Sequence, residues 1–83
     1  MGTLTEEVRL SVSLPDPATA RKIRRRARVS RGRFAGELGV HEITVARWER
    51  GTRRPRGDLR VRYARLLESL DQAATAAERD RAS

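Results

Sequence analysis

The side chains with the greatest chemical capacity in this sequence are arginines, and they gather in one part of the chain. Residues 17–56 hold 13 basic and three acidic residues, a net charge of +10, whereas the remainder holds six basic and eight acidic residues. A guanidinium binds phosphate through a permanent charge and a fork of N–H donors, and the same fork matches the O6 and N7 acceptors of guanine. The block therefore predicts non-covalent binding of a polyanion, with release of counterions as phosphates are neutralised.

The basic block could also arise in two less specific ways. Eighteen of the 19 basic residues are arginine and alanine is abundant, so a GC-rich genome accounts for part of the count. An anionic membrane surface would also attract the block. We favour a polynucleotide, because a helix-turn-helix pattern lies inside the same block.

The composition gives no support to catalysis, metal binding or membrane insertion. The chain has one histidine, no cysteine, no paired carboxylates at a useful spacing and no glycine loop that could cradle phosphate. We therefore expect no enzyme, no metal, no cofactor and no small-molecule ligand. No apolar run approaches the roughly 20 residues that span a bilayer, and no secretory signal is evident. The expected location is the cytoplasm, with the protein on the nucleoid when bound.

Hydrophobic periodicity predicts four helices in one small domain. The pair Asp16-Pro17 can cap and begin the first helix, which carries an apolar stripe of small residues and isoleucine. Two short helices are expected over about 31–38 and from residue 41 or 42 to residue 50. A last helix can start at Asp58, with an apolar stripe at Leu59, Tyr63, Leu66, Leu67 and Leu70.

The two ends of the chain have different patterns. Residues 8–14 alternate apolar and polar side chains, as a half-buried strand does, and such a strand needs a partner. It could pair with its copy in a second subunit, which we favour, lie along the helices, or form an ordered arm. Residues 71–83 are expected to extend the last helix for a turn or two and then fray. The expected organisation is an arm or dimerisation element at 1–15, a DNA-binding domain at 16–71 and a partly helical or disordered tail at 72–83.

The stretch from Ser30 to Gly51 has the physical features of two short helices that cross steeply over a tight turn. Ala35 is small where the helices approach each other, and Gly39 relieves the turn. Val40 and Val45 fill the angle between the helices. The second helix would then present an outward face made of Glu42, Ile43, Thr44, Ala46 and Arg47.

This stretch resembles the helix-turn-helix family of lambda repressor and Cro, often called Xre-like. The matching features are a small residue in the first helix of the pair, the turn Leu38-Gly39-Val40, and the ending Trp48-Glu49-Arg50-Gly51 with Pro55 four residues on. The resemblance covers about residues 19–70. It implies a compact all-α domain of four or five helices that binds double-stranded operator DNA, usually as a homodimer on an inverted repeat.

The resemblance also implies structural roles and reveals departures. It implies that Glu49 ties its helix to an arginine of the first helix, Arg24 or Arg25, and we expect Trp48 to pack in the core against Tyr63 or Leu66. Where the family commonly has glutamine, this chain has Arg31, which can bind phosphate but cannot copy an amide network. Position 36 is glycine, which weakens a short helix by roughly 1 kcal/mol relative to alanine.

Four residues are candidates for reading bases in the major groove. Arg47 is the first, because a bidentate contact to guanine discriminates by roughly 1–3 kcal/mol; the alternative is a phosphate contact or a free side chain. Thr44 suits a thymine edge, or is a solvated helix residue. Glu42 could accept from a cytosine amine, or favour the start of its helix. Ile43 could contact a thymine methyl group, or pack against a neighbouring loop.

Residues at both ends of the reading helix are candidates for phosphate contacts. Such contacts set register and affinity without carrying sequence information. We expect three of the five arginines to touch DNA, and His41 to serve as a helix cap or a phosphate contact. The candidates are Arg31, Arg33, His41, Arg50, Arg53 and Arg54.

The predicted function is that of a sequence-specific transcriptional regulator. We expect a repressor or Cro-like protein, of a kind that phages and mobile elements encode. The alternatives are the antitoxin of a toxin-antitoxin pair, an architectural or recombination accessory protein, and a pure protein-interaction module. The basic loop after Gly51 argues against the last.

Overall fold

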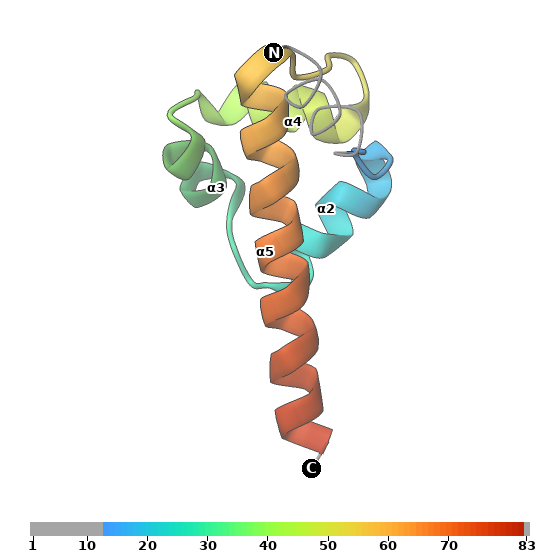
Figure 1. Ribbon diagram of the computed structural model, residues 1–83. Coiled ribbons are helices and arrows are strands. Elements are labelled where there is room, and N and C mark those ends of the chain that lie inside the picture. Colours follow the sequence, from blue (N-terminus) through green and yellow to red (C-terminus); the bar gives the residue numbers. More distant parts are fainter. Residues whose placement is uncertain (1–12, 83) are drawn as a thin grey trace.

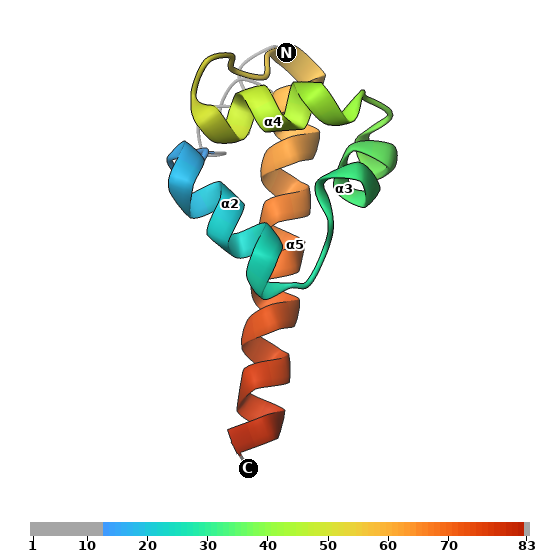
Figure 2. The ribbon, with the colours of Figure 1, turned by 180° about the vertical axis from the view of Figure 1, so that it is seen from behind.

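The computed structural model describes residues 13–82, and its regular elements there are all helices. In chain order they are α2 (Pro17–Arg26), α3 (Arg31–Leu38), α4 (Glu42–Arg50) and α5 (Gly57–Ala82). The three short helices surround the N-terminal half of α5, and the rest of α5 projects from this bundle (Figures 1 and 2). The predicted compact all-α class is confirmed. The strand expected at residues 8–14 lies outside the described residues except for Ser13 and Leu14, which belong to no helix or strand.

Each short helix begins at a residue whose side chain caps it. Asp16 accepts a hydrogen bond from the Thr19 amide at 2.7 Å, and hydrogen bonding with Thr19 lowers the pKa of the Asp16 carboxyl. Ser30 accepts from the Arg33 amide at 3.1 Å, and His41 Nδ1 accepts from the Ile43 amide at 3.1 Å. These bonds satisfy backbone donors that the first turn of a helix leaves unpaired. The predicted cap at Asp16 and the cap role of His41 are confirmed.

Two glycines end the helices of the helix-turn-helix. Gly39 follows α3 with a φ of 70°, and Gly51 follows α4 with a φ of 78°. A side chain with a Cβ is strained in this left-handed region, which glycine adopts freely. The turn between α3 and α4 and the end of α4 are therefore specified locally, as the sequence predicts.

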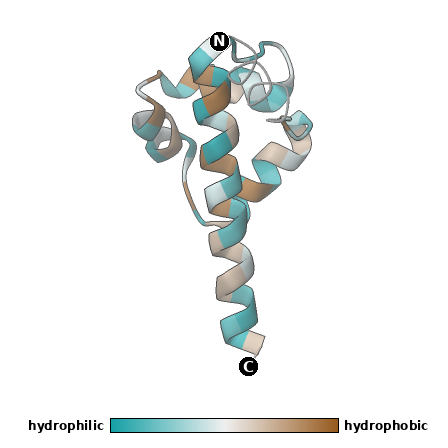
Figure 3. Cartoon of the chain, in the orientation of Figure 1, coloured by the Kyte–Doolittle hydropathy of each residue, from teal (hydrophilic) through white to brown (hydrophobic). Residues whose placement is uncertain are grey.

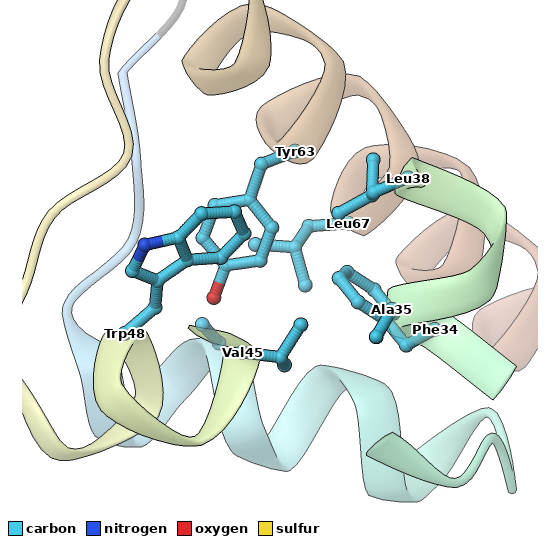
Figure 4. Close-up of a cluster of buried hydrophobic side chains, with 8 residues drawn as sticks. Phe34, Ala35, Leu38, Val45, Trp48, Tyr63 and Leu67 are labelled. Carbon is cyan, nitrogen blue, oxygen red and sulfur yellow. The ribbon is translucent and has the colours of Figure 1, made fainter. Parts of the chain in front are cut away.

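The core lies where the three short helices meet the first half of α5, and α2 contributes the buried Ala20 to it. Phe34 and Val45 are completely buried, and the Tyr63 ring packs between the Phe34 ring at 5.6 Å and the Trp48 ring at 4.8 Å, measured between centroids (Figure 4). The expected contact of Trp48 with Tyr63 is confirmed. This core packs α3 and α4 against α5. The crossing angle between α3 and α4 is therefore stabilised by packing as well as by the turn that connects them.

The last helix is longer than predicted. Instead of fraying a turn or two after residue 71, α5 continues to Ala82, and its distal half mixes polar and weakly apolar residues (Figure 3). Arg26 at the end of α2 explains part of the difference, since it forms ion pairs with Asp71 and Glu78, both at 3.0 Å. Alanine, which fills much of this segment, is also the strongest helix former. Ala74 is buried beside the same contacts.

Candidate nucleic-acid interface

The outward face of α4 is narrower than the sequence pattern predicted. Ala46, expected on that face, is 6% exposed and therefore belongs to the buried side of α4. Each residue turns a helix by about 100°, which places position 46 next to Glu49 on the side that packs against α2. By the same rotation Ile43, Arg47 and Arg50 share one arc of the surface, and all three are exposed. Thr44 lies at the edge of this arc and is half-buried.

Ile43 has an unusual exposure for its type. Its side chain is 48% exposed, and no other large apolar residue between positions 13 and 82 is comparably exposed. Both explanations expected from the sequence, a thymine methyl contact and packing against a neighbouring loop, stay predictions at this exposure. An apolar side chain beside Arg47 on a solvent-facing helix is suited to contact a thymine methyl group.

Glu42 is turned away from this arc. It occupies the first position of α4, and a Cβ built on Gly32 of α3 would lie 3.5 Å from the Glu42 Oε2 atom. The carboxylate thus sits over the first turn of α3, where the partial positive charge of a helix start favours an anion. The charge expected at the start of α4 is in place, since Glu42 is the acidic residue of its first turn, and base reading by Glu42 stays a prediction.

The arginines after α4 form a basic hollow together with α4 itself. Arg47, Arg53, Arg54 and Arg56 line a depression of about 620 Å³, whose remaining walls are Thr44, Trp48, Pro55 and Leu59. Arg47 of α4 is thus brought together with Arg53 and Arg54, which follow it by six and seven residues in the chain. Sequence reasoning missed Arg56. Its sequence signal was its place directly after Pro55, at the end of the basic loop that follows Gly51.

The predicted phosphate-binding residues do not all lie at this hollow. Arg33 lines a different depression on the flank of α3, with Arg28, Glu37 and Leu70 among its neighbours. Arg31 is half-buried at the first position of α3, and Arg50 is exposed near the end of α4. Since the Nδ1 atom of His41 is occupied by the cap of α4, only its Nε2 atom is available to a ligand. The candidates therefore lie in three places: Arg53 and Arg54 at the hollow with Arg50 at the end of α4, His41 at the start of α4, and Arg31 and Arg33 on α3.

A buried ion pair fixes α4 against α2. Arg24 donates from Nε to Glu49 Oε2 at 2.6 Å and from Nη2 to Oε1 at 3.0 Å, and its Nη1 donates to the Val29 carbonyl at 2.8 Å. The two side chains are 8% and 5% exposed. The expected tie from Glu49 is confirmed, with Arg24 as its partner. The pair also places an acidic charge inside the domain, away from the basic surface.

The burial of Tyr63 affects its ionisation. Burial raises the pKa of the Tyr63 hydroxyl to about 12, with a further contribution from the nearby negative charge of Glu49. Tyr63 is therefore neutral at any physiological pH and acts as a core residue. Among residues 13–82 no cluster of three or more histidine or acidic side chains could hold a metal ion. No described helix is both long enough and apolar enough to cross a membrane.

A helix-turn-helix whose second helix is exposed among arginines defines the class of DNA-binding domains of that name. Comparison with protein families agrees, since the model of the helix-turn-helix family HTH_3 matches residues 20–72. The chain belongs to this Cro/C1-type family, the one that includes lambda repressor and Xre-like proteins. It is accordingly a DNA-binding helix-turn-helix regulator. No curated protein and no solved structure gives a significant match.

Proposed function

We propose that the protein is a sequence-specific regulator of transcription, a repressor or Cro-like protein, that places α4 in the major groove of double-stranded DNA. One observation carries this proposal. Arg47 belongs both to the exposed arc of α4 and to the wall of the basic hollow, next to Arg53, Arg54 and Arg56. A helix that enters the groove there would have phosphate-binding side chains beside the adjoining backbone.

The proposed assignment of base contacts and phosphate contacts follows from the exposure and the chemistry of each side chain. Arg47 contacts a guanine edge, while Ile43 and Thr44 contact thymine through their methyl groups. Glu42 contributes negative charge at the starts of α3 and α4, and its exposed carboxylate accepts from a cytosine amine in the groove. The phosphate contacts come from Arg53, Arg54 and Arg56 at the hollow and Arg50 at the end of α4, and from His41 at the start of α4 with Arg31 and Arg33 on α3.

The protein is further proposed to act as a homodimer on an inverted repeat, in the cytoplasm and on the nucleoid. One domain offers one reading helix, and its exposed arc covers only a few base pairs. Two copies related by a two-fold axis would read two half-sites about one helical turn apart. Regulation would then follow from protein concentration and from competition at the operator, as expected of a repressor from a phage or mobile element.

An unbiased selection of binding sites from random duplex DNA tests the proposal. The purified protein should enrich a short motif, present twice in inverted orientation. Enrichment of a single half-site would support sequence-specific DNA recognition but contradict the proposed homodimer. Failure to enrich any sequence would contradict the whole proposal. Purification of the protein from its native cells with a bound small protein would favour the antitoxin function instead.

A further inference from the structure

The carbonyl of Arg47 is the point to which the basic loop is attached. Thr52 donates to this carbonyl twice, from its amide at 3.0 Å and from its hydroxyl Oγ1 at 3.2 Å, and the Arg53 amide approaches it at 3.4 Å. The C-cap Gly51 amide also donates to it. The residue proposed to read a base therefore holds, through its own backbone, the segment that carries the phosphate-binding arginines.

The backbone donors at this carbonyl belong to the end of the helix, but the Thr52 hydroxyl is an additional link. Gly51 lies in the left-handed conformation, so the chain reverses there and Thr52 is its first residue beyond the helix cap. Thr52 is exposed and takes no part in the core. A hydroxyl that bonds at an exposed site contributes only modestly to stability, so its removal should leave the domain folded.

We infer that Thr52 is a positioning residue that sets the register between base reading and phosphate binding. Its hydroxyl holds the start of the loop against Arg47, which keeps Arg53 and Arg54 at a fixed offset from the Arg47 side chain. The inference rests on the proposed function and extends it to a residue that touches neither base nor phosphate. If the loop is free to shift, its arginines still bind any duplex, but fewer of them reach a phosphate while Arg47 contacts its base.

The test compares Thr52→Val, which keeps the shape and removes the donor, with Thr52→Ser, which keeps the donor. Binding to the selected site and to a scrambled duplex is measured over a range of salt concentrations, and urea unfolding corrects each value for the folded fraction. For Thr52→Val we expect the ratio of specific to non-specific affinity to fall by about 2- to 10-fold, the range of one hydrogen bond. The salt dependence of specific binding should weaken by about 0.9 in slope for each phosphate that the variant no longer neutralises. Thr52→Ser should restore both.

A background without the loop arginines makes the test sharper. In Arg53→Ala/Arg54→Ala, Thr52→Val should cause no further decrease, because the side chains it positions are gone. An unchanged specificity ratio and salt slope in Thr52→Val, or a Thr52→Ser protein as impaired as Thr52→Val, would overturn the inference while leaving the proposed function intact. Absence of specific binding by the wild-type protein would overturn both.

Discussion

Arg24 of α2 and Glu49 of α4 are joined by two parallel hydrogen bonds in a position almost closed to water. The geometry is the fork-to-carboxylate pairing that only arginine can make, and the third donor of the guanidinium is used by the Val29 carbonyl. The pair thus connects three segments: α2, the α2–α3 link and the reading helix. The orientation of α4 depends on it as well as on the hydrophobic core.

Removal of one partner of this pair should destabilise the domain strongly. For Glu49→Gln we expect a loss of about 3–5 kcal/mol in the free energy of unfolding, because Arg24 is left as a buried charge without a counter-charge. Urea denaturation followed by circular dichroism measures it. The exposed Arg25→Gln is the matched control and should change stability little. A double replacement, Arg24→Met with Glu49→Leu, should recover much of the loss; if it is as unstable as Glu49→Gln alone, the uncompensated charge is not the cause.

Arg47 and Arg53 should differ in how their removal affects recognition. Arg47→Ala should reduce discrimination at one or two base pairs by roughly 1–3 kcal/mol, whereas Arg53→Ala should weaken all duplexes similarly and reduce the salt dependence. Competition binding with single-base-pair variants of the selected site separates the two outcomes. Arg65→Ala on the exposed side of α5 serves as a control for the removal of one positive charge. A selected motif that is unchanged in Arg47→Ala would rule out its base-reading role.

Two glycines three residues apart should respond to alanine in opposite directions. Gly36 lies inside α3, and an added Cβ would meet no atom within 4 Å, so Gly36→Ala should stabilise the domain by about 0.5–1 kcal/mol through helix propensity. Gly39 is equally open to solvent but has a φ of 70°, so Gly39→Ala should cost about 1–2 kcal/mol in backbone strain alone. Chemical denaturation of both variants provides the comparison. Changes of the same sign would mean that helix propensity and backbone strain do not govern these two sites.

The helix boundaries could be predicted from sequence because their causes are local. Asp16, Ser30, Gly39 and Gly51 each act within a few residues of their own position, through a cap or a left-handed turn. The core contact of Trp48 with Tyr63 could also be predicted from the sequence, because both residues belong to apolar stripes on helices that must pack together.

The features that sequence reasoning did not predict depend on tertiary contacts. The burial of Ala46 comes from the way α2 packs on α4, and an alanine is equally acceptable on an exposed or a buried face. The full length of α5 depends partly on Arg26, which reaches from α2 to Asp71 and Glu78, 45 and 52 residues away in the chain. The basic hollow also could not be predicted from the sequence. Which arginines lie close together depends on the path of the loop after α4, and the composition gives only their number.

Alkaline pH should destabilise the protein through Tyr63. Its pKa is about 12 in the folded chain against an ordinary value of 10.0, so the folded state holds the proton more tightly than the unfolded state does. As the pH rises above 10, unfolded chains release this proton first, and the free energy of unfolding should fall progressively until about pH 12; below pH 10 the contribution is complete.

Tyr63→Phe keeps the ring and removes the titration, so it should lose less stability than the wild type between pH 9 and pH 11 in urea denaturation. Because the chain has a single tyrosine, absorbance of the phenolate follows the same event directly. A tyrosine that ionises near pH 10 while the helices remain intact would contradict its placement in the core.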